Sequence, residues 1–195
     1  MTLRKASFYA IKYACLNYHY SRAVPSVSDA FSVFNEKDEW CGVVCFSAGA
    51  NNNICKPFGL VQGQVIELVR VALNGKQGHG RTSMVIAMSL KQVKKNNPLV
   101  SLIVSYADPE QGHVGGIYQA TNWVYIGKSK AQREVIDPKT GKVMHKRTAN
   151  SIYGTIKGLE KSKIMWKHKY VYPLTRKMRK FCDEIRLDYP KKTGD

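Results

Sequence analysis

Asp108 and Tyr118 are the two residues whose placement first suggests catalysis. They lie in VSYADPEQGHVGGIYQATNWVYIG (104–127), where an apolar run stops at an Asp-Pro and a glycine-rich turn precedes the tyrosine. A carboxylate at the carboxyl end of a central strand can orient or deprotonate a substrate, and a tyrosine can donate a proton. The structural alternatives are a turn residue for Asp108, since Asp before Pro often starts turns, and a core aromatic for Tyr118.

The segment NGKQGHGRTS (74–83) predicts an anion site. It supplies Gly75, Gly78 and Gly80, with Arg81 beside them, between an apolar strand and a helix. Backbone amides converge where a glycine-rich turn meets a helix N-terminus, and they can hold a phosphate group. A plain surface turn is the alternative, because such turns are common before helices without any ligand.

Arg70 is a further candidate for a functional side chain. It lies near the end of the strand VIELVRVAL (65–73), among apolar neighbours. Its charge therefore requires either a buried carboxylate or a ligand anion. Structural pairing with Glu67 or Asp108 is the alternative to ligand binding.

The elements that must position these residues alternate between strands and helices. From residue 29 the pattern predicts a two-stranded hairpin, followed by elements listed here in order: a strand at 65–73, a helix at 84–95, a strand at 99–108, a short helix at 115–123 and a strand at 124–129. Fully apolar strands flanked by helices belong to a sheet covered on both faces. The sequence therefore predicts an α/β fold with a central mixed sheet, in a single domain over residues 1–195.

Outside this core the pattern predicts a short helix at 5–16 and loops at 18–25 and 49–59. After residue 128 it predicts, in order, a second hairpin at 133–147 with DPKTG as its turn, a helical or looped stretch at 149–162, a strand at 167–174, a basic helix at 175–186 and a loose tail, KKTGD. We interpret residues 128–195 as a basic C-terminal extension of the same domain.

The net charge of +17 is concentrated in this extension. Residues 128–195 hold 19 Lys and Arg against 7 Asp and Glu, net +12, whereas residues 1–127 hold 12 against 7, net +5. Such a surface binds polyanions by releasing their counterions, so nucleic acid is the first partner to consider. A merely soluble, highly charged surface is the alternative.

The composition disfavours membrane and disulfide-rich classes. No stretch approaches the ~20 apolar residues of a membrane span, and the N-terminus lacks the apolar middle of a signal peptide, so we expect a soluble, intracellular protein. The five cysteines include no CxxC pair, so we expect free, buried thiols rather than disulfides or a structural zinc site. Cys41 and Cys45 are four residues apart in a predicted strand, which places them on the same face.

The order of elements from 65 to 127 resembles the core of the GNAT acyltransferase superfamily. In that superfamily the glycine loop holds the pyrophosphate of acyl-coenzyme A, which implies a cofactor site at Gly78, Gly80 and Arg81. A tyrosine on the later helix can protonate the departing thiolate, and Tyr118 falls there. The usual loop opens with Gln or Arg three positions before its first paired glycine, and that place is Gly75 here.

A narrower resemblance rests on four blocks, which are YHYSR (18–22), ELVR (67–70), SYAD (105–108) and YQATNWVYIG (118–127). Together they look like the Mom family of phage DNA-modification proteins, a GNAT-like group that converts adenine in DNA to methylcarbamoyl-adenine and so protects phage genomes from restriction. The resemblance implies active-site positions at His19, Tyr20, Arg70, Asp108 and Tyr118. It also implies double-stranded DNA as the partner and, for a phage-encoded chain, the cytoplasm of the host cell.

The same resemblance implies an iron ion, since the family has been linked to one. His19, Tyr20 and Asp108 form a mixed nitrogen and oxygen set of the kind that non-haem iron accepts. The usual facial triad asks for a second histidine, and His79 and His113 are candidates by loop position only. Acetyl-coenzyme A or another acyl-coenzyme A is the other cofactor to consider.

Adenine's amine is hidden in duplex DNA, so its modification requires the base to be extruded or a melted strand to be captured. The aromatic side chains of Trp123, Tyr125 and Trp166 are candidates for stacking on bases, although core positions are as typical of them. The extension 128–195 would grip phosphates without reading much sequence. The alternatives to a DNA-modifying enzyme are an acyl-coenzyme A dependent N-acyltransferase acting on a protein or small amine, and a non-catalytic basic protein that binds nucleic acid.

Overall fold

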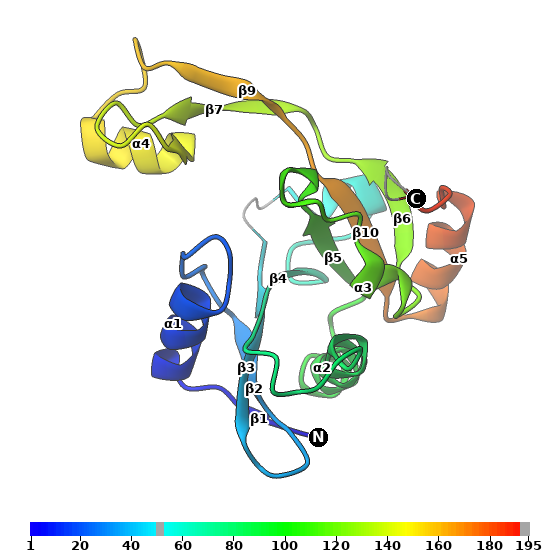
Figure 1. The fold of residues 1–195 in the computed structure, drawn as a ribbon. Coiled ribbons are helices and arrows are strands. Elements are labelled where there is room, and N and C mark those ends of the chain that lie inside the picture. The colour runs from blue at the N-terminus through cyan, green and yellow to red at the C-terminus, as the bar shows by residue number, and fades with distance from the viewer. Residues whose placement is uncertain (50–52, 192–195) are drawn as a thin grey trace.

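The computed structural model of the protein describes residues 1–49 and 53–191. Its main element is a seven-stranded mixed sheet (Figure 1), in the spatial order β1 (Thr2–Lys5), β2 (Asp29–Phe34), β3 (Trp40–Ser47), β4 (Val65–Leu73), β5 (Leu102–Ala107), β10 (His168–Pro173) and β6 (Val124–Lys128). Every neighbouring pair in this sheet is antiparallel except β4 and β5. The predicted α/β fold with a central mixed sheet is confirmed.

Helices cover both faces of the sheet. The helical elements of the main body are α1 (Phe8–Asn17), α2 (Thr82–Asn96), α3 (Gly116–Gln119) and α5 (Arg176–Glu184), with short 3-10 turns η1 (Lys56–Phe58) and η2 (Pro109–Gln111). In β4, Ile66 and Leu68 pack in the cluster that contains α2, whereas Val65 and Val69 belong to the clusters under α5 and α1. Because side chains alternate along β4, its two faces meet different helices: α2 and α3 cover one face of the sheet, and α1 and α5 cover the other.

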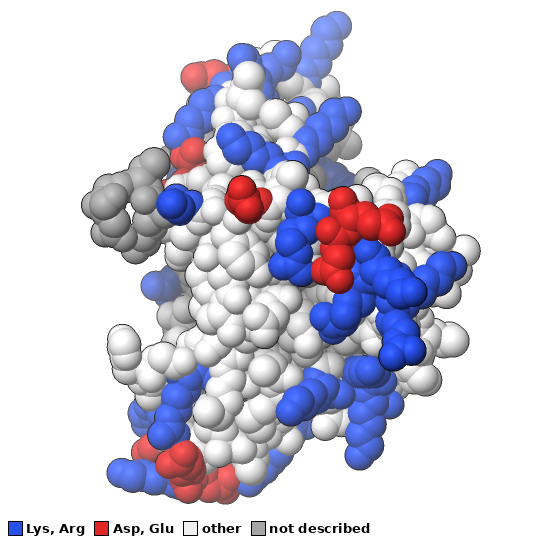
Figure 2. Space-filling view, turned by 90° about the vertical axis from the view of Figure 1, so that its right-hand side faces the viewer, with Lys and Arg blue, Asp and Glu red and all other residues white. Residues whose placement is uncertain are grey.

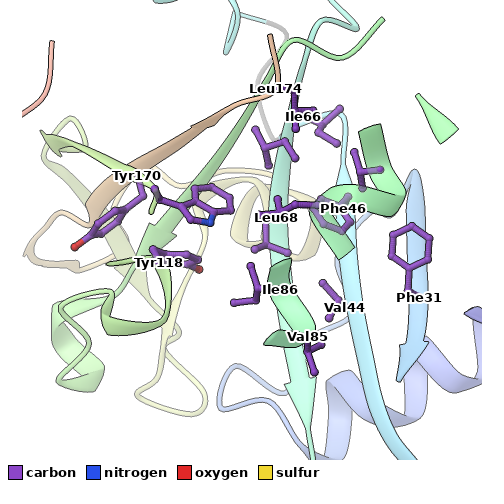
Figure 3. Packing of buried hydrophobic residues seen from close by; sticks show 14 of the residues in the cluster. Phe31, Val44, Phe46, Ile66, Leu68, Val85, Ile86, Tyr118, Tyr170 and Leu174 are labelled. Carbon is purple, nitrogen blue, oxygen red and sulfur yellow. The ribbon is translucent and has the colours of Figure 1, made fainter. Parts of the chain in front are cut away.

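The largest apolar cluster lies between the sheet and α2 (Figure 3). Val85, Ile86 and Leu90 of α2 are buried against Phe46 and Leu68, because their spacing places them on one side of the helix. β5 is buried on both faces, as its continuous apolar run predicts. The helix begins after Arg81, which is its N-cap and provides no side-chain hydrogen bond to the first turn.

β3 contains a bulge that breaks the alternation of its side chains. Phe34 pairs with Trp40 and Val33 with Gly42, which leaves Cys41 as an extra residue. Cys41 therefore packs in the cluster with α2, and Cys45 packs on the opposite face against α1. The prediction that these two cysteines face the same side is wrong for this reason. All five cysteines are free and buried, as expected.

The connection between β6 and β10 is a long insertion, which we call the arm (residues 129–167). It contains a three-stranded sheet of β7 (Gln132–Ile136), β8 (Val143–Met144) and β9 (Lys161–Met165), with helix α4 (Lys146–Tyr153). The predicted second hairpin is confirmed by the pairing of β7 with β8 around the Asp137 turn. Figure 1 shows the arm extending from the β6 and β10 side of the sheet to a position above α1.

The ends of the described chain differ in smaller ways from the sequence prediction. The first residues form β1, which pairs with β2, so the N-terminal helix begins at Phe8 and not at residue 5. The loop predicted at 49–59 contains η1, and residues 50–52 of that loop lie outside the described residues. Residues 192–195 of the predicted tail also lie outside them. Among the described residues, no helix has the length and apolar character needed to cross a membrane.

We predict that Gly42→Ala lowers the free energy of unfolding by about 2–4 kcal/mol. Gly42 has a φ of +128°, and a Cβ at this position would lie 2.0 Å from the Ala72 carbonyl oxygen, so β3 and β4 would have to separate. Urea unfolding would measure the loss. Gly63→Ala is the matched control, because Gly63 has a φ of +88° with no atom near its Cβ position, so only the backbone strain of about 1 kcal/mol should appear. Equal losses in the two variants would contradict the steric explanation.

Candidate active site

A pocket opens where β4 and β5 separate. The two strands are paired only from Val65 with Leu102 to Glu67 with Val104. Beyond this point β4 contains a bulge at Val69, since Phe46 pairs with Leu68 and Cys45 with Arg70. The space between the diverging strands forms a pocket of about 740 Å³. Ligands of α/β proteins bind at the carboxyl ends of strands where neighbouring strands part.

All five residues predicted to be catalytic line this pocket. His19 and Tyr20 come from the loop after α1, and Arg70 comes from the bulged part of β4. Asp108 follows the last residue of β5, and Tyr118 lies on α3. Segments far apart in the sequence therefore meet at one site. Lys167, at the end of the arm, completes the lining.

Asp108 is held in place by the turn that follows β5. Its side chain caps η2, with Oδ1 accepting a hydrogen bond from the Glu110 backbone N–H at 3.1 Å. Its other oxygen, Oδ2, lies 3.3 Å from Nζ of Lys167. The turn function considered for this residue is thus present, and it leaves the carboxylate facing the pocket, with a side chain 16% exposed.

His19 is a neutral imidazole in this site. Its Nδ1 accepts a hydrogen bond from the backbone N–H of Ser21 at 3.1 Å, which places the ring proton on Nε2. Burial, together with the smaller electrostatic effects of Arg70, His113 and Lys167, lowers the pKa of His19 to about 4. At neutral pH this residue can therefore donate a hydrogen bond without carrying a charge.

Tyr20 lies beside His19, with ring centroids 4.3 Å apart, and makes an edge-type contact with His113, whose ring centroid is 5.9 Å away. Burial raises the pKa of Tyr20, so its hydroxyl remains protonated at neutral pH. The ring is 47% exposed, which is high for a residue that lines a pocket. An exposed aromatic ring at the entrance of a pocket provides a surface on which a planar ligand can stack.

Arg70 brings a positive charge into the pocket. One terminal nitrogen, Nη1, donates to the Val69 carbonyl at 2.7 Å, a contact that the bulge in β4 makes accessible. Its Nε is buried and has no hydrogen-bond partner among the described residues. A buried donor without a partner is costly, so a ligand that accepts a hydrogen bond here would be stabilised.

The hydroxyl of Tyr118 is hydrogen-bonded at the point where β4 and β5 separate. The Ser105 hydroxyl lies 2.8 Å from both the Leu68 carbonyl and the Tyr118 hydroxyl. Because a carbonyl can only accept, Ser105 donates to Leu68 and accepts from Tyr118. Burial raises the pKa of Tyr118 to about 12. The ring packs against Trp123 and Tyr170, at 5.1 and 5.2 Å, as Figure 3 shows for Tyr170, so the residue is also a core aromatic.

The sequence prediction missed two residues of this site. Ser105 lies in an apolar strand, where a hydroxyl is an unusual inward residue, and this exception was its only local signal. Lys167 was predicted only as part of the basic extension 128–195, because nothing in the sequence links it to Asp108. His113, named for its place in a loop, does line the pocket, whereas His79 is not among the lining residues.

The predicted iron ligands lie together, but their present contacts do not fit a metal ion. In the parts of the chain that are described, no group of three His, Cys, Asp or Glu side chains is arranged to hold one. Nζ of Lys167 lies 3.3 Å from Oδ2 of Asp108, and the positive charge of Arg70 lowers the pKa of His19. Neighbouring cations oppose the binding of another cation. Iron therefore stays a prediction, and no chemical step below uses it.

The glycine loop before α2 lies outside this pocket's lining. Gly75, Gly78 and Gly80 all have positive φ, which only glycine adopts without strain. Arg81 pairs with Glu36 at 2.5 Å, and the buried side chain of Gln77 lies within the loop, 3.3 Å from the Thr82 hydroxyl. The predicted cofactor site at Gly78, Gly80 and Arg81 thus has a suitable backbone, and its arginine already has an acidic partner.

The predicted stacking residues are mostly internal. Trp123 and Tyr125 are buried in the core of the sheet, as their structural alternative predicts. Trp166 is partly exposed at the end of the arm, where the ammonium of Lys128 lies 4.0 Å from its ring centroid. The aromatic surface of the pocket comes instead from tyrosines, among them Tyr18, Tyr20 and Tyr106.

Comparison with solved structures defines the fold class. A mutant of the spermidine N-acetyltransferase SpeG from Vibrio cholerae matches with a TM-score of 0.51 at 14% identity, covering 91% of this chain and 99% of that chain. A Bacillus subtilis acetyltransferase in complex with CoA matches with a TM-score of 0.50 at 10% identity, covering 89% and 98%. At identities this low the comparison establishes only the fold. That fold is GNAT-like, as the sequence predicts.

The chain itself belongs to the Mom protein family, whose sequence pattern matches residues 1–191. Methylcarbamoylase mom of Escherichia phage Mu is 31% identical over 87 residues, which are 45% of this chain and 35% of that protein. The aligned region thus spans about a third of this curated relative. The family resemblance predicted from the four sequence blocks is confirmed.

We predict that His19 titrates with a pKa of about 4 and that Lys167→Met raises this value. Removing a nearby positive charge makes protonation of the ring easier. NMR titration of the imidazole protons would measure both values. Lys161→Met is the control, since it removes another exposed charge from the arm and should leave the His19 pKa unchanged. A wild-type His19 that titrates near 6.5 would contradict its desolvated position in the pocket.

Proposed function

We propose that this protein is an enzyme that converts adenine in double-stranded DNA to methylcarbamoyl-adenine, a modification that protects the DNA from restriction. The observation that carries the proposal is the convergence of His19, Tyr20, Arg70, Asp108 and Tyr118 on one pocket. Membership of the Mom family and the methylcarbamoylase activity for which the phage Mu relative is named support the reaction.

The pocket suits a single extruded base. Its volume of about 740 Å³ falls within the range of pockets that bind small molecules. Tyrosine rings supply flat apolar surfaces, and Arg70, Asp108 and the Nε2 proton of His19 supply polar groups of different kinds. Enzymes that act on bases read them in this way, by stacking and by hydrogen bonds to their edges.

Asp108 acts on the nucleophile. The exocyclic amine of adenine is a poor nucleophile because its lone pair is delocalised into the ring. Asp108 accepts a hydrogen bond from this amine and takes one of its protons as nitrogen forms a bond to the incoming carbon. The leaving group of the donor departs with the electron pair of the bond that breaks. Lys167, 3.3 Å from Oδ2, holds the carboxylate in its orientation.

The hydrogen-bond donors of the pocket, including the positively charged Arg70, stabilise the group that is transferred to the amine. Arg70 and the neutral His19 both line the pocket, and each carries an N–H group available to a ligand, Nε of Arg70 and Nε2 of His19. Donors placed in this way stabilise a carbonyl oxygen or an anionic leaving group better than bulk water does, because they need no reorganisation. Tyr118, with its high pKa and its bond to Ser105, fixes the wall of the pocket and remains protonated.

An acyl-coenzyme A dependent N-acyltransferase is the second candidate. The GNAT-like fold and the three positive-φ glycines before α2 favour it. The ion pair between Arg81 and Glu36 and the buried side chain of Gln77 weaken it, because both occupy the loop that would receive the pyrophosphate. Titration with acetyl-coenzyme A, with and without DNA, separates this candidate from the first.

We predict that DNA from cells expressing this chain contains an adenosine heavier by an acetamide group, and that Asp108→Asn abolishes it. The amide keeps the shape of the carboxylate but cannot take a proton, so a loss of about 100-fold or more is expected. Mass spectrometry of the nucleosides would measure the modified fraction.

Asp188→Asn is the control for this experiment, because Asp188 is an exposed acid away from the pocket and the variant should modify DNA like the wild type. Unmodified DNA in the presence of folded wild-type protein would count against the proposal. Tight binding of acetyl-coenzyme A in that case would favour the acyltransferase instead.

A further inference from the structure

The arm carries a large excess of positive charge. Its sequence contains ten Lys and Arg residues, all of them exposed, against three acids. Two of these acids, Glu134 and Asp137, are only 7% and 8% exposed. Lys163 and Lys167 pair with Glu110 and Asp108 of the main sheet, and the other eight cationic side chains lie on the outside of the arm, where Glu160 is the one exposed acid among the arm's described residues.

The two buried acids hold the arm together. Glu134 accepts a hydrogen bond from the Lys146 backbone N–H at the start of α4. Asp137 accepts from the Tyr153 hydroxyl at 2.6 Å and from the Thr140 hydroxyl at 2.7 Å. These contacts fasten α4 and the turn to β7, so the acids are structural and do not neutralise the outer surface.

The surface around α5 is also basic, but its positive charges are mixed with exposed acids. The segment 174–191 contains six Lys and Arg residues and three acids, and all nine are exposed. Arg186 pairs with Asp183 at 2.8 Å. Figure 2, viewed from the side that carries α5, shows Lys and Arg interspersed with Asp and Glu over this face and a further group of Lys and Arg at the top, where the arm lies. The charge density of the arm is the higher of the two.

The root of the arm lies at the edge of the pocket. Ser129 and Lys167 are joined by two hydrogen bonds, from the Ser129 N–H to the Lys167 carbonyl at 2.7 Å and from the Lys167 N–H to the Ser129 hydroxyl at 2.9 Å. Lys167 reaches Asp108, and Lys163 forms an ion pair with Glu110 in η2. α5 contributes no residue to the pocket lining.

We propose that the arm, residues 129–167, is the surface that binds duplex DNA, and that it holds the duplex beside the pocket while α5 has no part in binding. The proposal rests on the proposed function only for the choice of DNA as partner. An exposed cationic surface with few acids binds phosphates by counterion release. A two-stranded ribbon and a short helix are also the elements that fit against the grooves of a duplex.

Two charge-matched variants test the assignment. The arm variant replaces Lys139, Lys142, Lys157 and Lys161 by Gln, and the α5 variant replaces Arg176, Lys177, Arg179 and Lys180 by Gln; each removes four exposed charges. Binding to a fluorescent duplex of mixed sequence is measured by anisotropy over a series of salt concentrations. The measurement needs no modification of the DNA.

A third variant removes the arm entirely. Since Ser129 and Lys167 are already hydrogen-bonded across the β6 and β10 hairpin, residues 130–166 can be replaced by an Asn-Gly turn that preserves the sheet, Lys167 and Asp108. Circular dichroism and thermal unfolding verify the fold. If this variant does not fold, the two charge-matched variants still decide the question.

The arm variant should bind at least about tenfold more weakly, and the slope of log K against log salt should become shallower by up to about 3.6, the contribution of four phosphate contacts. The α5 variant should match the wild type. Equal losses in both variants, or an unchanged slope in the arm variant, would overturn the proposal.

Two further results separate this proposal from the proposed function. Arm-dependent DNA binding without any modified adenosine supports the arm assignment and counts against the enzyme. Removal of the arm that leaves DNA binding intact but converts a dimer into a monomer, as measured by light scattering, overturns the proposal and makes the arm a contact between two copies of the chain.

Discussion

The separation of β4 from β5 after three paired residues is the constraint on which the site depends. Two parallel strands that part leave backbone groups without partners, and those groups must be satisfied in another way. Here the Ser105 hydroxyl bonds the Leu68 carbonyl at the point of separation and receives the Tyr118 hydroxyl in turn. The bulge at Val69 turns the following part of β4 away and brings Arg70 to the opening. One serine and one bulge thus maintain a pocket that the hydrophobic core would otherwise fill.

The charges of the pocket follow from this geometry. Arg70 and Lys167 enter from opposite sides, from β4 and from the end of the arm, and Asp108 lies within reach of Lys167. His19, which is desolvated beside these cations, stays neutral. The site therefore combines the Asp108 carboxylate, which can accept a hydrogen bond, with several donors able to stabilise negative charge. A transfer of a carbon group to a weakly nucleophilic amine needs both at once.

Local patterns in the sequence predicted most of the fold and pointed to Asp108, Tyr118 and Arg70, whereas His19 and Tyr20 came from the family resemblance. Apolar runs defined β4 and β5, the spacing of Val85 to Val93 fits the buried side of α2, and the Asp-Pro after β5 located Asp108 at a strand end. Features that depend on pairing between strands were not visible. The extra residue Cys41 reverses the side chains of β3, and Lys167 meets Asp108 only because β10 enters the sheet next to β5. No local pattern encodes either arrangement.

The arm shows why such non-local placement matters for function. β6 and β10 would form a complete hairpin without it, since Ser129 and Lys167 already close their ends. The arm therefore has its own small sheet and its own buried acids, and its charged surface can differ from that of the main sheet without disturbing the apolar core. Because its last residue is also a lining residue of the pocket, a ligand that moves the arm would also move Lys167 relative to Asp108. The proposed DNA binding on the arm and the proposed proton transfer to Asp108 would in this way be connected through Lys167.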